Sequence, residues 1–260
     1  MQQAMSSNTT ILITGANRGI GKGLVAVYLA VPNTTVVATV RDPSHPTAES
    51  LQSLPKATGS SLIVIKLDVS STESINSGIK SLGSTHDVHG LDVVIANAGI
   101  AGMSDPLTLT PVSELQKFIN VNAYGPLELF QAVASLLRSS KADNKGKFVL
   151  ISSAGGSLTT MNTILPLAGY GASKALANFL FKWLALESED VLIWAQHPGM
   201  VASDMGTAGF DAAKEIGIDL SAHAISVEES AQAIKQIVDR STFENIRGKF
   251  IGPDGSELPW

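Results

Sequence analysis

The sequence predicts a single-domain α/β fold, built on a doubly wound parallel sheet of about seven strands with helices on both faces. Two observations predict it. Short, continuous apolar runs rich in β-branched residues recur along the chain, as is typical of strands covered on both faces. Segments with helical spacing separate these runs almost from end to end, which favours parallel strands joined by helical crossovers.

The predicted strands are the apolar runs, and each is short enough for one pass through a sheet. They cover residues 10–14, 35–40, 62–67, 91–96, 147–152, 191–195 and 249–252. The predicted helices cover residues 19–30, 71–82, 112–138, 171–188 and 227–239. The third of them has clear starting signals in Thr110, Pro111 and Glu114.

One connection is too long for a simple turn. Residues 198–226 contain four glycines and the pattern of one short helix near residues 211–216. A connection of this length in a compact domain is typical of a functional lid, which we place at residues 203–225. No repeat or linker interrupts the rest, so residues 1–260 are predicted to form one domain.

Composition excludes several classes of protein. The chain has 260 residues, a formal net charge of −5, and no cysteine, which excludes disulfide-stapled modules and cysteine-based metal or thiol sites. The mild acidity leaves no basic stripe for nucleic acid or an anionic membrane. The densest apolar region, residues 179–186, is broken by Lys182, and residues 1–10 lack the layout of a secretory signal. We therefore expect a soluble, cytoplasmic protein.

A glycine-rich segment follows the first predicted strand directly and opens the first predicted helix. It reads Thr14-Gly15-Ala16-Asn17-Arg18-Gly19-Ile20-Gly21. Glycines here let the backbone turn tightly and approach a pyrophosphate, whose charge is met by amides at the helix N-terminus. The G-x-x-x-G-x-G spacing differs from the commoner G-x-G-x-x-G, and a plain strand-to-helix turn also uses glycines. Its position favours a Rossmann-type dinucleotide site.

The choice of dinucleotide depends on the end of the second predicted strand, about 20 residues further on. Arg41 lies there with Asp42 beside it, and Arg18 lies within the glycine segment. Two guanidinium groups are suited to clamp a 2′-phosphate, whereas Asp42 would repel it. The sequence thus favours NADPH/NADP+, against the alternative that Arg41 and Asp42 are ordinary solvated charges.

Acid–base candidates are few. Of the three tyrosines, Tyr28, Tyr124 and Tyr170, only Tyr170 is followed four residues later by a lysine, Lys174. Residues at this spacing share a helix face, so the ammonium can stabilise a phenolate. A Tyr-x-x-x-Lys pair is also common on solvated helices.

Other polar residues lie where predicted strands end. Ser152 and Ser153 close one strand, and Asn97-Ala98-Gly99 closes another, with Asn122 in the helical segment that follows. Open α/β sheets bind ligands at the carboxyl ends of their strands, so these side chains are expected to converge on one site.

Together these residues resemble the short-chain dehydrogenase/reductase family. The glycine segment, Asp68-Val69, Asn97-Ala98-Gly99, Asn122, Ser153, Tyr170, Lys174 and Pro198-Gly199 occur in the family's order over nearly the whole chain. Residues 197–205, 227–230 and 250–260 are similar to a carbonyl-reductase-type branch that includes the fungal norsolorinic acid ketoreductases, which act on aromatic polyketide ketones.

The resemblance implies roles for individual residues. Tyr170 would protonate a substrate carbonyl that Ser153 hydrogen-bonds, and Lys174 would bind the nicotinamide ribose and depress the pKa of Tyr170. Asn122 would hold a water that links Lys174 to solvent. The implied cofactor-binding residues are Gly15, Asn17, Arg18, Gly19, Ile20, Gly21, Arg41, Asp68, Val69, Asn97, Ala98, Gly99, Tyr170, Lys174, Pro198, Gly199, Val201, Ser203 and Met205.

The chain departs from the family pattern in two places. Ser153 and Tyr170 are 17 residues apart where family members have about a dozen, and Ser157 is 13 residues before the tyrosine. We prefer Ser153, because it closes a strand, and ascribe the difference to a longer loop. Ser203 replaces the family's threonine and keeps the hydroxyl that would hold the nicotinamide amide.

The remaining distinctive residues have plainer interpretations. His45, His86, His89 and His223 lack ligand spacing, so surface or capping roles are favoured over a metal site, and none is predicted. His197 is expected to shape the turn before Pro198. Trp183 and Trp194 are expected in the core, and Trp260 is expected to anchor the C-terminal segment.

The predicted function is an NADPH-dependent reductase that transfers hydride to a ketone or aldehyde. Small and aliphatic residues at 207–224 point to a bulky apolar, polyketide-like substrate. The alternatives are an alcohol dehydrogenase working in the oxidative direction and a non-catalytic NADP(H)-sensing protein. From the resemblance we expect a homodimer or homotetramer built on the helices at 112–138 and 171–188.

Overall fold

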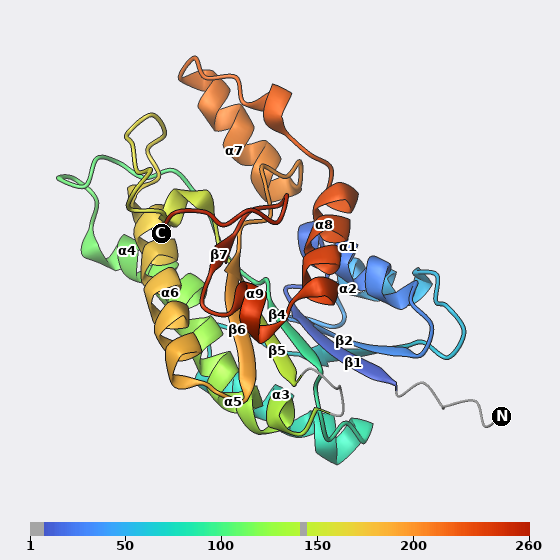
Figure 1. The fold of residues 1–260 in the computed structure, drawn as a ribbon. Coiled ribbons are helices and arrows are strands. Elements are labelled where there is room, and N and C mark those ends of the chain that lie inside the picture. Colours follow the sequence, from blue (N-terminus) through green and yellow to red (C-terminus); the bar gives the residue numbers. More distant parts are fainter. Residues whose placement is uncertain (1–7, 141–144) are drawn as a thin grey trace.

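A computed structural model describes residues 8–140 and 145–260, and it has the predicted architecture (Figure 1). Seven parallel strands form one sheet in the order β3-β2-β1-β4-β5-β6-β7. The order reverses between β1 and β4, which is the place where such sheets bind their ligands. The fold class is therefore confirmed.

The strands match the predicted apolar runs to within a few residues at their ends. They are β1 (Thr9–Thr14), β2 (Thr34–Val40), β3 (Ser61–Lys66), β4 (Val93–Ala96), β5 (Gly146–Ile151), β6 (Val191–Gln196) and β7 (Phe250–Ile251). Every residue of β2, β4, β5 and β6 is buried, because helices cover both faces of the sheet.

The helices also follow the predicted order. They are α1 (Gly19–Leu29), α2 (Pro46–Glu49), α3 (Thr72–His86), α4 (Val112–Ile119), α5 (Gly125–Arg138), α6 (Ala168–Glu187), α7 (Asp204–Glu215), α8 (Val227–Arg240) and α9 (Phe243–Ile246). The four-residue helices α2 and α9 were not predicted, since one turn has too few residues to show a period.

The helix predicted at residues 112–138 is in fact two helices joined by a π-helical turn, η2 (Asn120–Tyr124). Pro126 explains the interruption. It has no N–H to donate to the carbonyl of Asn122, and its ring would crowd that carbonyl in a regular helix. The widened turn carries one of the predicted catalytic residues.

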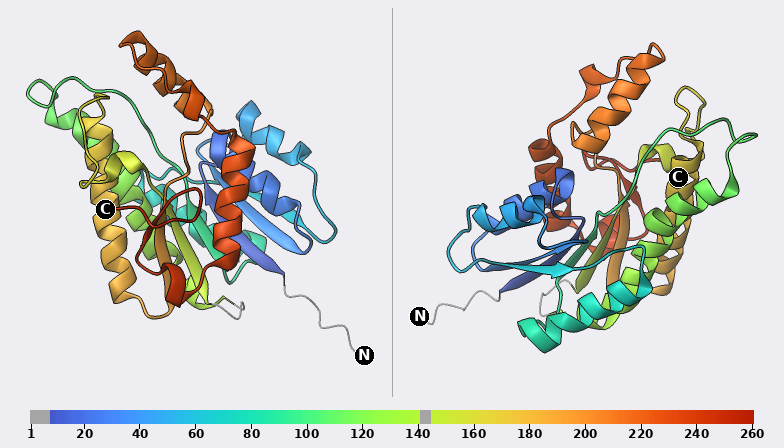
Figure 2. Two further views of the ribbon diagram at one scale, coloured as in Figure 1. Left: turned by 45° about the horizontal axis from the view of Figure 1, so that its top comes forward. Right: turned by 180° about the vertical axis from the view of Figure 1, so that it is seen from behind.

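The helices form two layers with separate cores (Figure 2). On one face α1 and α8 pack together, and their apolar side chains form one core with Ile11 and Ile13 of β1. On the other face α3, α5 and α6 cover the sheet and contact Leu12, the residue between those two. Alternate residues of one strand therefore serve opposite cores.

The lid prediction needs a correction in its secondary structure. The helix in this connection runs over twelve residues, Asp204–Glu215, and does not lie near residues 211–216 alone. It begins earlier because the Ser203 hydroxyl accepts a hydrogen bond from the Gly206 amide (3.2 Å) and caps it. Figures 1 and 2 show α7 projecting from the rest of the molecule.

The two tryptophans expected in the core differ. Trp194, in β6, is fully buried, but Trp183 is 55% exposed, so that prediction was wrong. On α6 the residues that face the sheet are Ala177, Phe181 and Ala185, and Trp183 lies on the outer side of the helix.

Within residues 8–140 and 145–260, none of the helices has the length and apolar character required to cross a membrane. The predicted absence of a secretory signal concerns residues 1–10, of which residues 1–7 lie outside the described residues.

Candidate functional site

The glycine segment forms the turn from β1 into α1. Gly15 and Gly19 have positive φ angles of 63° and 52°, in the region that favours glycine. A Cβ at Gly21 would overlap the Gly15 carbonyl oxygen and lie 2.7 Å from Asn97 Nδ2. The glycines are therefore needed for the tight turn that the sequence predicted, which packs against the end of a second strand, while the approach of this backbone to a pyrophosphate stays a prediction.

The N-terminus of α1 is open to an anion. Its N-cap residue, Arg18, makes no side-chain capping bond. The first amides of an uncapped helix need another acceptor, and together with the helix dipole they suit a pyrophosphate. The cradle thus fits a dinucleotide.

The end of β4 holds this turn in place. Asn97 Nδ2 donates to the carbonyl oxygens of Thr14 (2.9 Å) and Gly15 (3.3 Å). The amides of Asn97 and Ala98 both donate to the Thr14 hydroxyl, each at 3.0 Å. The Asn97 side chain, which the resemblance implies for cofactor binding, therefore braces the glycine turn.

Asp68 and Arg41 lie near each other, at the ends of β3 and β2. Burial disfavours the charged form of Asp68, but hydrogen bonds from Ser70 and the charge of Arg41 outweigh it and hold its pKa below the usual range. Asp42 is exposed, and its carboxylate is engaged by the amide (2.9 Å) and hydroxyl (2.6 Å) of Ser44. The acidic side chain beside Arg41 is thus tied into a local turn.

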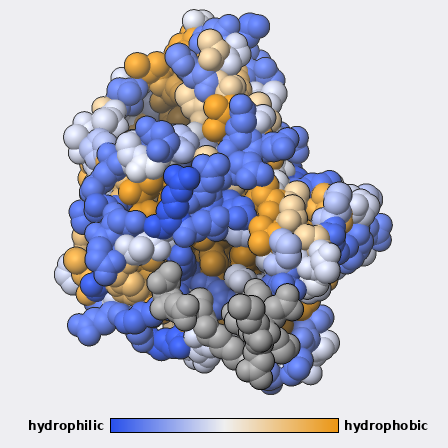
Figure 3. Space-filling model, turned by 45° about the vertical axis from the view of Figure 1, so that its right-hand side comes forward, coloured by the Kyte–Doolittle hydropathy of each residue, from blue (hydrophilic) through white to orange (hydrophobic). Residues whose placement is uncertain are grey.

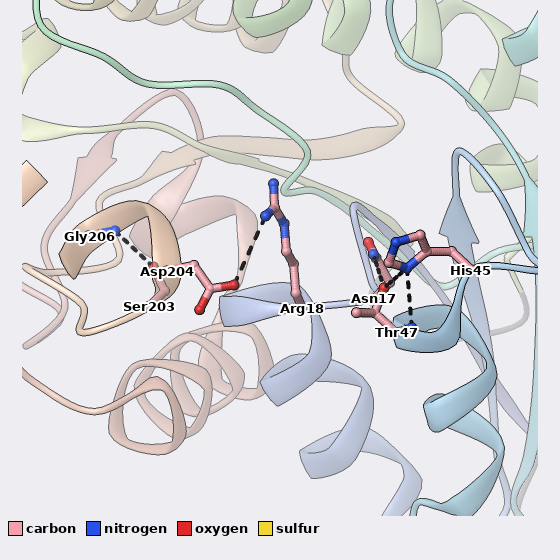
Figure 4. Close-up of polar contacts among 7 residues, drawn as sticks. All are labelled: Asn17, Arg18, His45, Thr47, Ser203, Asp204 and Gly206. Carbon is pink, nitrogen blue, oxygen red and sulfur yellow. Dashed lines mark hydrogen bonds and ion pairs between the residues drawn. The ribbon is translucent and has the colours of Figure 1, made fainter. Parts of the chain in front are cut away.

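Figure 4 shows two contacts of the glycine turn with distant segments. Asn17 Nδ2 donates to the Thr47 hydroxyl (2.7 Å), which also contacts His45 Nδ1 (2.8 Å), so α2 braces one side. On the other side Arg18 points toward α7, where its guanidinium lies 4.0 Å from the Asp204 carboxylate. Both partners are largely exposed, so this ion pair contributes little, at most about 1 kcal/mol.

Ser153 and Tyr170 meet at the carboxyl end of β5. Ser153 follows the strand directly, and its hydroxyl accepts the Gly155 amide (3.1 Å) and hydrogen-bonds with Tyr170. Protein atoms crowd the phenol, and this burial raises the pKa of Tyr170, which the hydrogen bond with Ser153 only partly offsets. The phenol therefore holds its proton at neutral pH.

Lys174 lies one turn further along α6 and is buried. Its Nζ donates to the Ile151 carbonyl (2.9 Å) and lies 5.9 Å from the centre of the Tyr170 ring. Burial lowers the pKa of Lys174 to about 8. The predicted depression of the Tyr170 pKa by this lysine was wrong: the pKa of Tyr170 is raised by burial, and the group that opposes this rise is Ser153, not Lys174.

Asn122 lies in the π-helical turn and is fully buried. Its side chain pairs with both backbone groups of Ile100: Oδ1 accepts the amide and Nδ2 donates to the carbonyl, each at 2.9 Å. Nδ2 also donates to the Ser173 hydroxyl (2.9 Å), which in turn donates to the Tyr170 carbonyl (2.6 Å). Asn122 thus fixes the segment after β4 against α6, while its predicted water relay stays a prediction.

Gly99, in the segment that follows β4, lies close to Asn122 and Lys174. A Cβ placed there would lie 3.0 Å from Asn122 Oδ1 and 3.8 Å from Lys174 Nζ. The segment after β4, the π-helical turn and the part of α6 that carries Lys174 therefore meet at one site.

The segment after β6 completes the site. Gly199 has a φ of 89°, Val201 pairs with Ile225, and a Cβ at Gly19 would lie 3.3 Å from the Ser203 side chain. Pro198 is held by the Ser230 hydroxyl (2.7 Å), and Met205 is exposed on the first turn of α7. This segment therefore reaches back to the glycine turn.

Ser157 and His197 both support loops next to the site. The buried Ser157 hydroxyl accepts the Thr160 amide (3.3 Å) and stabilises the loop before α6, whereas Ser153 contacts Tyr170. His197 Nδ1 accepts the Ala154 amide at 3.4 Å, and burial lowers the pKa of His197 to about 4, so the imidazole is neutral. It supports the turn that carries Ser153.

The sequence reasoning missed the residues that brace the site. Thr14, Thr47 and Ser173 hold Asn97, Asn17 and Asn122, respectively. Thr14 was signalled by its place directly before Gly15. The other two contacts join residues 30 and 51 positions apart, and no local pattern marks them.

Known proteins resemble this chain over most of its length. A family model of short chain dehydrogenases matches residues 9–214. A short chain dehydrogenase of Penicillium aethiopicum is 60% identical over 252 residues, 96% of this chain and 99% of the relative. The norsolorinic acid ketoreductase of Dothistroma septosporum is 39% identical and covers 98% of this chain and 94% of its own.

Solved structures resemble the fold. The NADPH-bound carbonyl reductase from chicken fatty liver has a TM-score of 0.84 and 28% identity, over 98% of this chain and all of its own. The carbonyl reductase Sniffer of D. melanogaster has a TM-score of 0.82 and 25% identity, with the same coverage. The chain therefore belongs to the short-chain dehydrogenase/reductase family and is an oxidoreductase.

Proposed function

We propose that the protein is an NADPH-dependent reductase that converts a bulky, apolar ketone or aldehyde to an alcohol, with Tyr170 as the general acid. One observation carries this proposal: Ser153, Tyr170 and Lys174 meet at the carboxyl edge of the sheet, where the glycine turn forms its cradle.

Each residue has a defined task in the reduction. The nicotinamide supplies a hydride to the carbonyl carbon. Ser153 donates a hydrogen bond to the carbonyl oxygen, and Tyr170 transfers its phenolic proton as negative charge develops there. The charge of Lys174, whose pKa is about 8, then favours the phenolate that remains.

The raised pKa of Tyr170 suits the phenol to the role of proton donor, because it holds its proton at neutral pH and can transfer it to a developing alkoxide. Oxidation of an alcohol at the same site needs the phenolate as a base, and the ratio of reduced to oxidised cofactor sets the net direction. The complete set of acid, serine and lysine also argues against a sensor that only binds the cofactor, because binding alone does not need a proton donor.

The preference for NADPH rests on Arg41. It is exposed at the end of β2, and the neighbouring carboxylate of Asp42 is already engaged by Ser44. Arg18 points toward Asp204 and would give up only a weak surface contact to turn to a 2′-phosphate. The carbonyl reductase from chicken fatty liver, which resembles the chain over its whole length, is NADPH-bound.

Replacing Arg41 with alanine should reduce the preference for NADPH over NADH about tenfold or more, because a charge-assisted bond to the 2′-phosphate is lost. The ratio of kcat/KM for the two cofactors measures this. Arg240→Ala, which removes an exposed guanidinium from the end of α8, serves as the control. An unchanged ratio in Arg41→Ala would show that this arginine does not select the cofactor.

The substrate proposal rests on the loops around Tyr170. From Phe148 to Ser173 no residue is charged. Leu158, Met161 and Ile164 of this stretch are 69%, 73% and 63% exposed, and the Ser104 amide joins it to the segment after β4 through the Pro166 carbonyl (2.9 Å). In Figure 3 hydrophobic residues gather around a hollow near the top of the molecule. Exposed apolar side chains around a site suit an uncharged, bulky ligand.

The relatives of this chain support an aromatic polyketide-like substrate, because three of them are norsolorinic acid ketoreductases, which are 33–39% identical to it in sequence. The test is a steady-state assay that follows NADPH absorbance with aliphatic, monocyclic and polycyclic aromatic ketones and the matching aldehydes. We expect consumption, with the highest kcat/KM for polycyclic ketones. No consumption with any carbonyl would favour the cofactor-sensing alternative.

We further propose that a second copy of the chain packs on α5 and α6. A groove between these helices is lined by Leu127, Gln131, Phe179, Leu180, Trp183, Leu184 and Glu187. Phe179 is 62% exposed and stacks on Trp183 at 5.9 Å, and the one charged group, Glu187, is tied to the Trp183 indole (2.6 Å). A two-fold axis lets one such apolar patch cover its own copy.

Phe179→Asp should therefore shift the protein from dimer to monomer, because it places a charge in the centre of the buried patch. Light scattering coupled to size-exclusion chromatography measures the mass. The control is Asn76→Asp, which adds the same charge to an exposed position of α3. A wild-type protein that is monomeric at micromolar concentration would contradict the proposal.

A further inference from the structure

The segment after β7 folds back along the sheet edge. Residues 252–256 form a turn closed by the hydrogen bond from the Gly252 amide to the Ser256 carbonyl (2.8 Å). Glu257 then pairs antiparallel with Ile251, and the Leu258 amide donates to the Phe250 carbonyl (2.7 Å). The chain is thereby led from β7 to the loop that precedes α6.

Trp260 is fixed by three different elements. Its ring stacks on Phe250, a fully buried residue of β7, with ring centres 5.5 Å apart. Lys182 of α6 places its ammonium 4.7 Å from the centre of the same ring. The main-chain oxygen of Trp260 accepts two hydrogen bonds from Thr159, one from the amide (3.0 Å) and one from the hydroxyl (2.7 Å).

The loop held in this way is the one that carries the exposed apolar side chains Leu158, Met161 and Ile164. Other side-chain hydrogen bonds of its tip stay within the loop, such as the one from the Ile164 amide to Asn162 Oδ1 (3.1 Å). Within the described residues, the Thr159 bonds thus tie the tip of this loop to a distant part of the chain, and the bond from the Ser104 amide to the Pro166 carbonyl ties its end near α6. Figures 1 and 2 show the C-terminal end beside this loop and the start of α6.

We propose that Thr159 and Trp260 are a positioning pair, which sets the height of the loop at residues 157–167 over Tyr170 and so decides how well a bulky carbonyl substrate fits. The proposal rests on the proposed reductase function and adds to it a residue pair outside the catalytic set. Neither side chain touches the reacting atoms. They act through Leu158, Met161 and Ile164, which neighbour Thr159 along the loop.

The distinction between large and small substrates follows from where Tyr170 is held. Tyr170 belongs to α6 and is fixed by Ser153 and, through its carbonyl, by Ser173. A loosened loop therefore leaves the acid in place and changes the walls around a large substrate. A small ketone, which needs the acid but not the walls, should hardly respond.

The test compares Thr159→Val with Thr159→Ser in the full-length protein saturated with NADPH. Valine keeps the shape and loses the hydroxyl donor, whereas serine keeps the donor. We expect Thr159→Val to raise KM for a polycyclic aromatic ketone about 2- to 10-fold, the range for one lost hydrogen bond, with KM for a short aliphatic ketone and kcat for both nearly unchanged. Thr159→Ser should restore the wild-type KM.

Thr160→Val is the matched control, because Thr160 is also an exposed residue of the loop and its hydroxyl makes no hydrogen bond within the described residues. Hydrogen exchange of residues 157–167 gives a second readout that does not need turnover. Faster exchange in Thr159→Val, reversed in Thr159→Ser and absent in Thr160→Val, is expected. Trp260→Ala should give the same loop exchange and the same KM split.

Two results would overturn the positioning role: unchanged exchange of the loop in Thr159→Val, or a KM change of equal size for the large and the small ketone, which is what a general loss of stability produces. A failure of the reductase function is read separately, as wild-type protein that consumes no NADPH with any carbonyl before a variant is measured.

Discussion

Tyr170→Phe should lower kcat for carbonyl reduction by about 10²- to 10⁴-fold, the usual contribution of a positioned general acid. Phenylalanine keeps the ring beside Lys174 and removes only the hydroxyl that hydrogen-bonds with Ser153. The cradle for the dinucleotide is built by the glycine turn and the end of β4, so the Kd for NADPH should stay within a few fold. Stopped-flow or steady-state turnover and a fluorescence titration of NADPH measure the two effects.

Tyr28→Phe is the control for this variant. Tyr28 is a buried tyrosine of α1 whose hydroxyl has no hydrogen-bond partner within residues 8–140 and 145–260. Its removal should leave kcat unchanged and the fold as stable as before or slightly more so, because an unsatisfied buried hydroxyl costs free energy. Turnover that survives in Tyr170→Phe would remove the phenol from the mechanism.

Gly21→Ala should weaken NADPH binding by at least about tenfold and lower the free energy of unfolding by about 1–3 kcal/mol, as overpacking of a tight site does. The new methyl would overlap the Gly15 carbonyl oxygen and lie 2.7 Å from Asn97 Nδ2. The first group is backbone of the glycine turn, and the second is the side chain that donates to the Thr14 and Gly15 carbonyls, so relief of the overlap displaces the cradle itself. Calorimetric titration of NADPH and chemical denaturation measure the losses.

Gly83→Ala separates this effect from the general effect of adding a methyl to a helix. Gly83 lies in α3, and a Cβ there would make only ordinary contacts, the nearest at 3.6 Å from His89. Alanine should stabilise this helix by up to about 1 kcal/mol and leave NADPH binding unchanged. If Gly21→Ala bound NADPH as tightly as Gly83→Ala, the close approach at Gly21 would not be part of the cofactor site.

Much of the fold could be predicted because its signals are local. Apolar runs and helical spacing locate strands and helices within a few residues, since each pattern depends on neighbours along the chain. Exceptions have local physical causes that the spacing does not show. Pro126 converts one expected helix into two around η2, and the Ser203 cap starts α7 well before its apolar pattern.

The type and order of site residues were also available from the sequence. Residues that end parallel strands must share one edge of the sheet, so Asn97 and Ser153 could be placed together before their contacts were known, whereas the Pro198 segment was assigned from the resemblance. The preference for Ser153 over Ser157 followed from this rule, and the contact of Ser153 with Tyr170 agrees with it.

Only the tertiary structure decided which side chains meet. Spacing along the sequence could not show that Trp183 is exposed while Trp194 is buried. Nor could it predict that the Asn97 side chain binds the glycine turn, or that Trp260 accepts a hydrogen bond from Thr159, 101 positions away. Local periodicity specifies which way a residue faces on its own element, whereas these contacts depend on how distant elements and aperiodic loops pack against one another. The sequence by itself therefore determined the fold and the chemical groups of this oxidoreductase. Packing between distant elements determined which residues brace those groups and how the loops around Tyr170 are shaped.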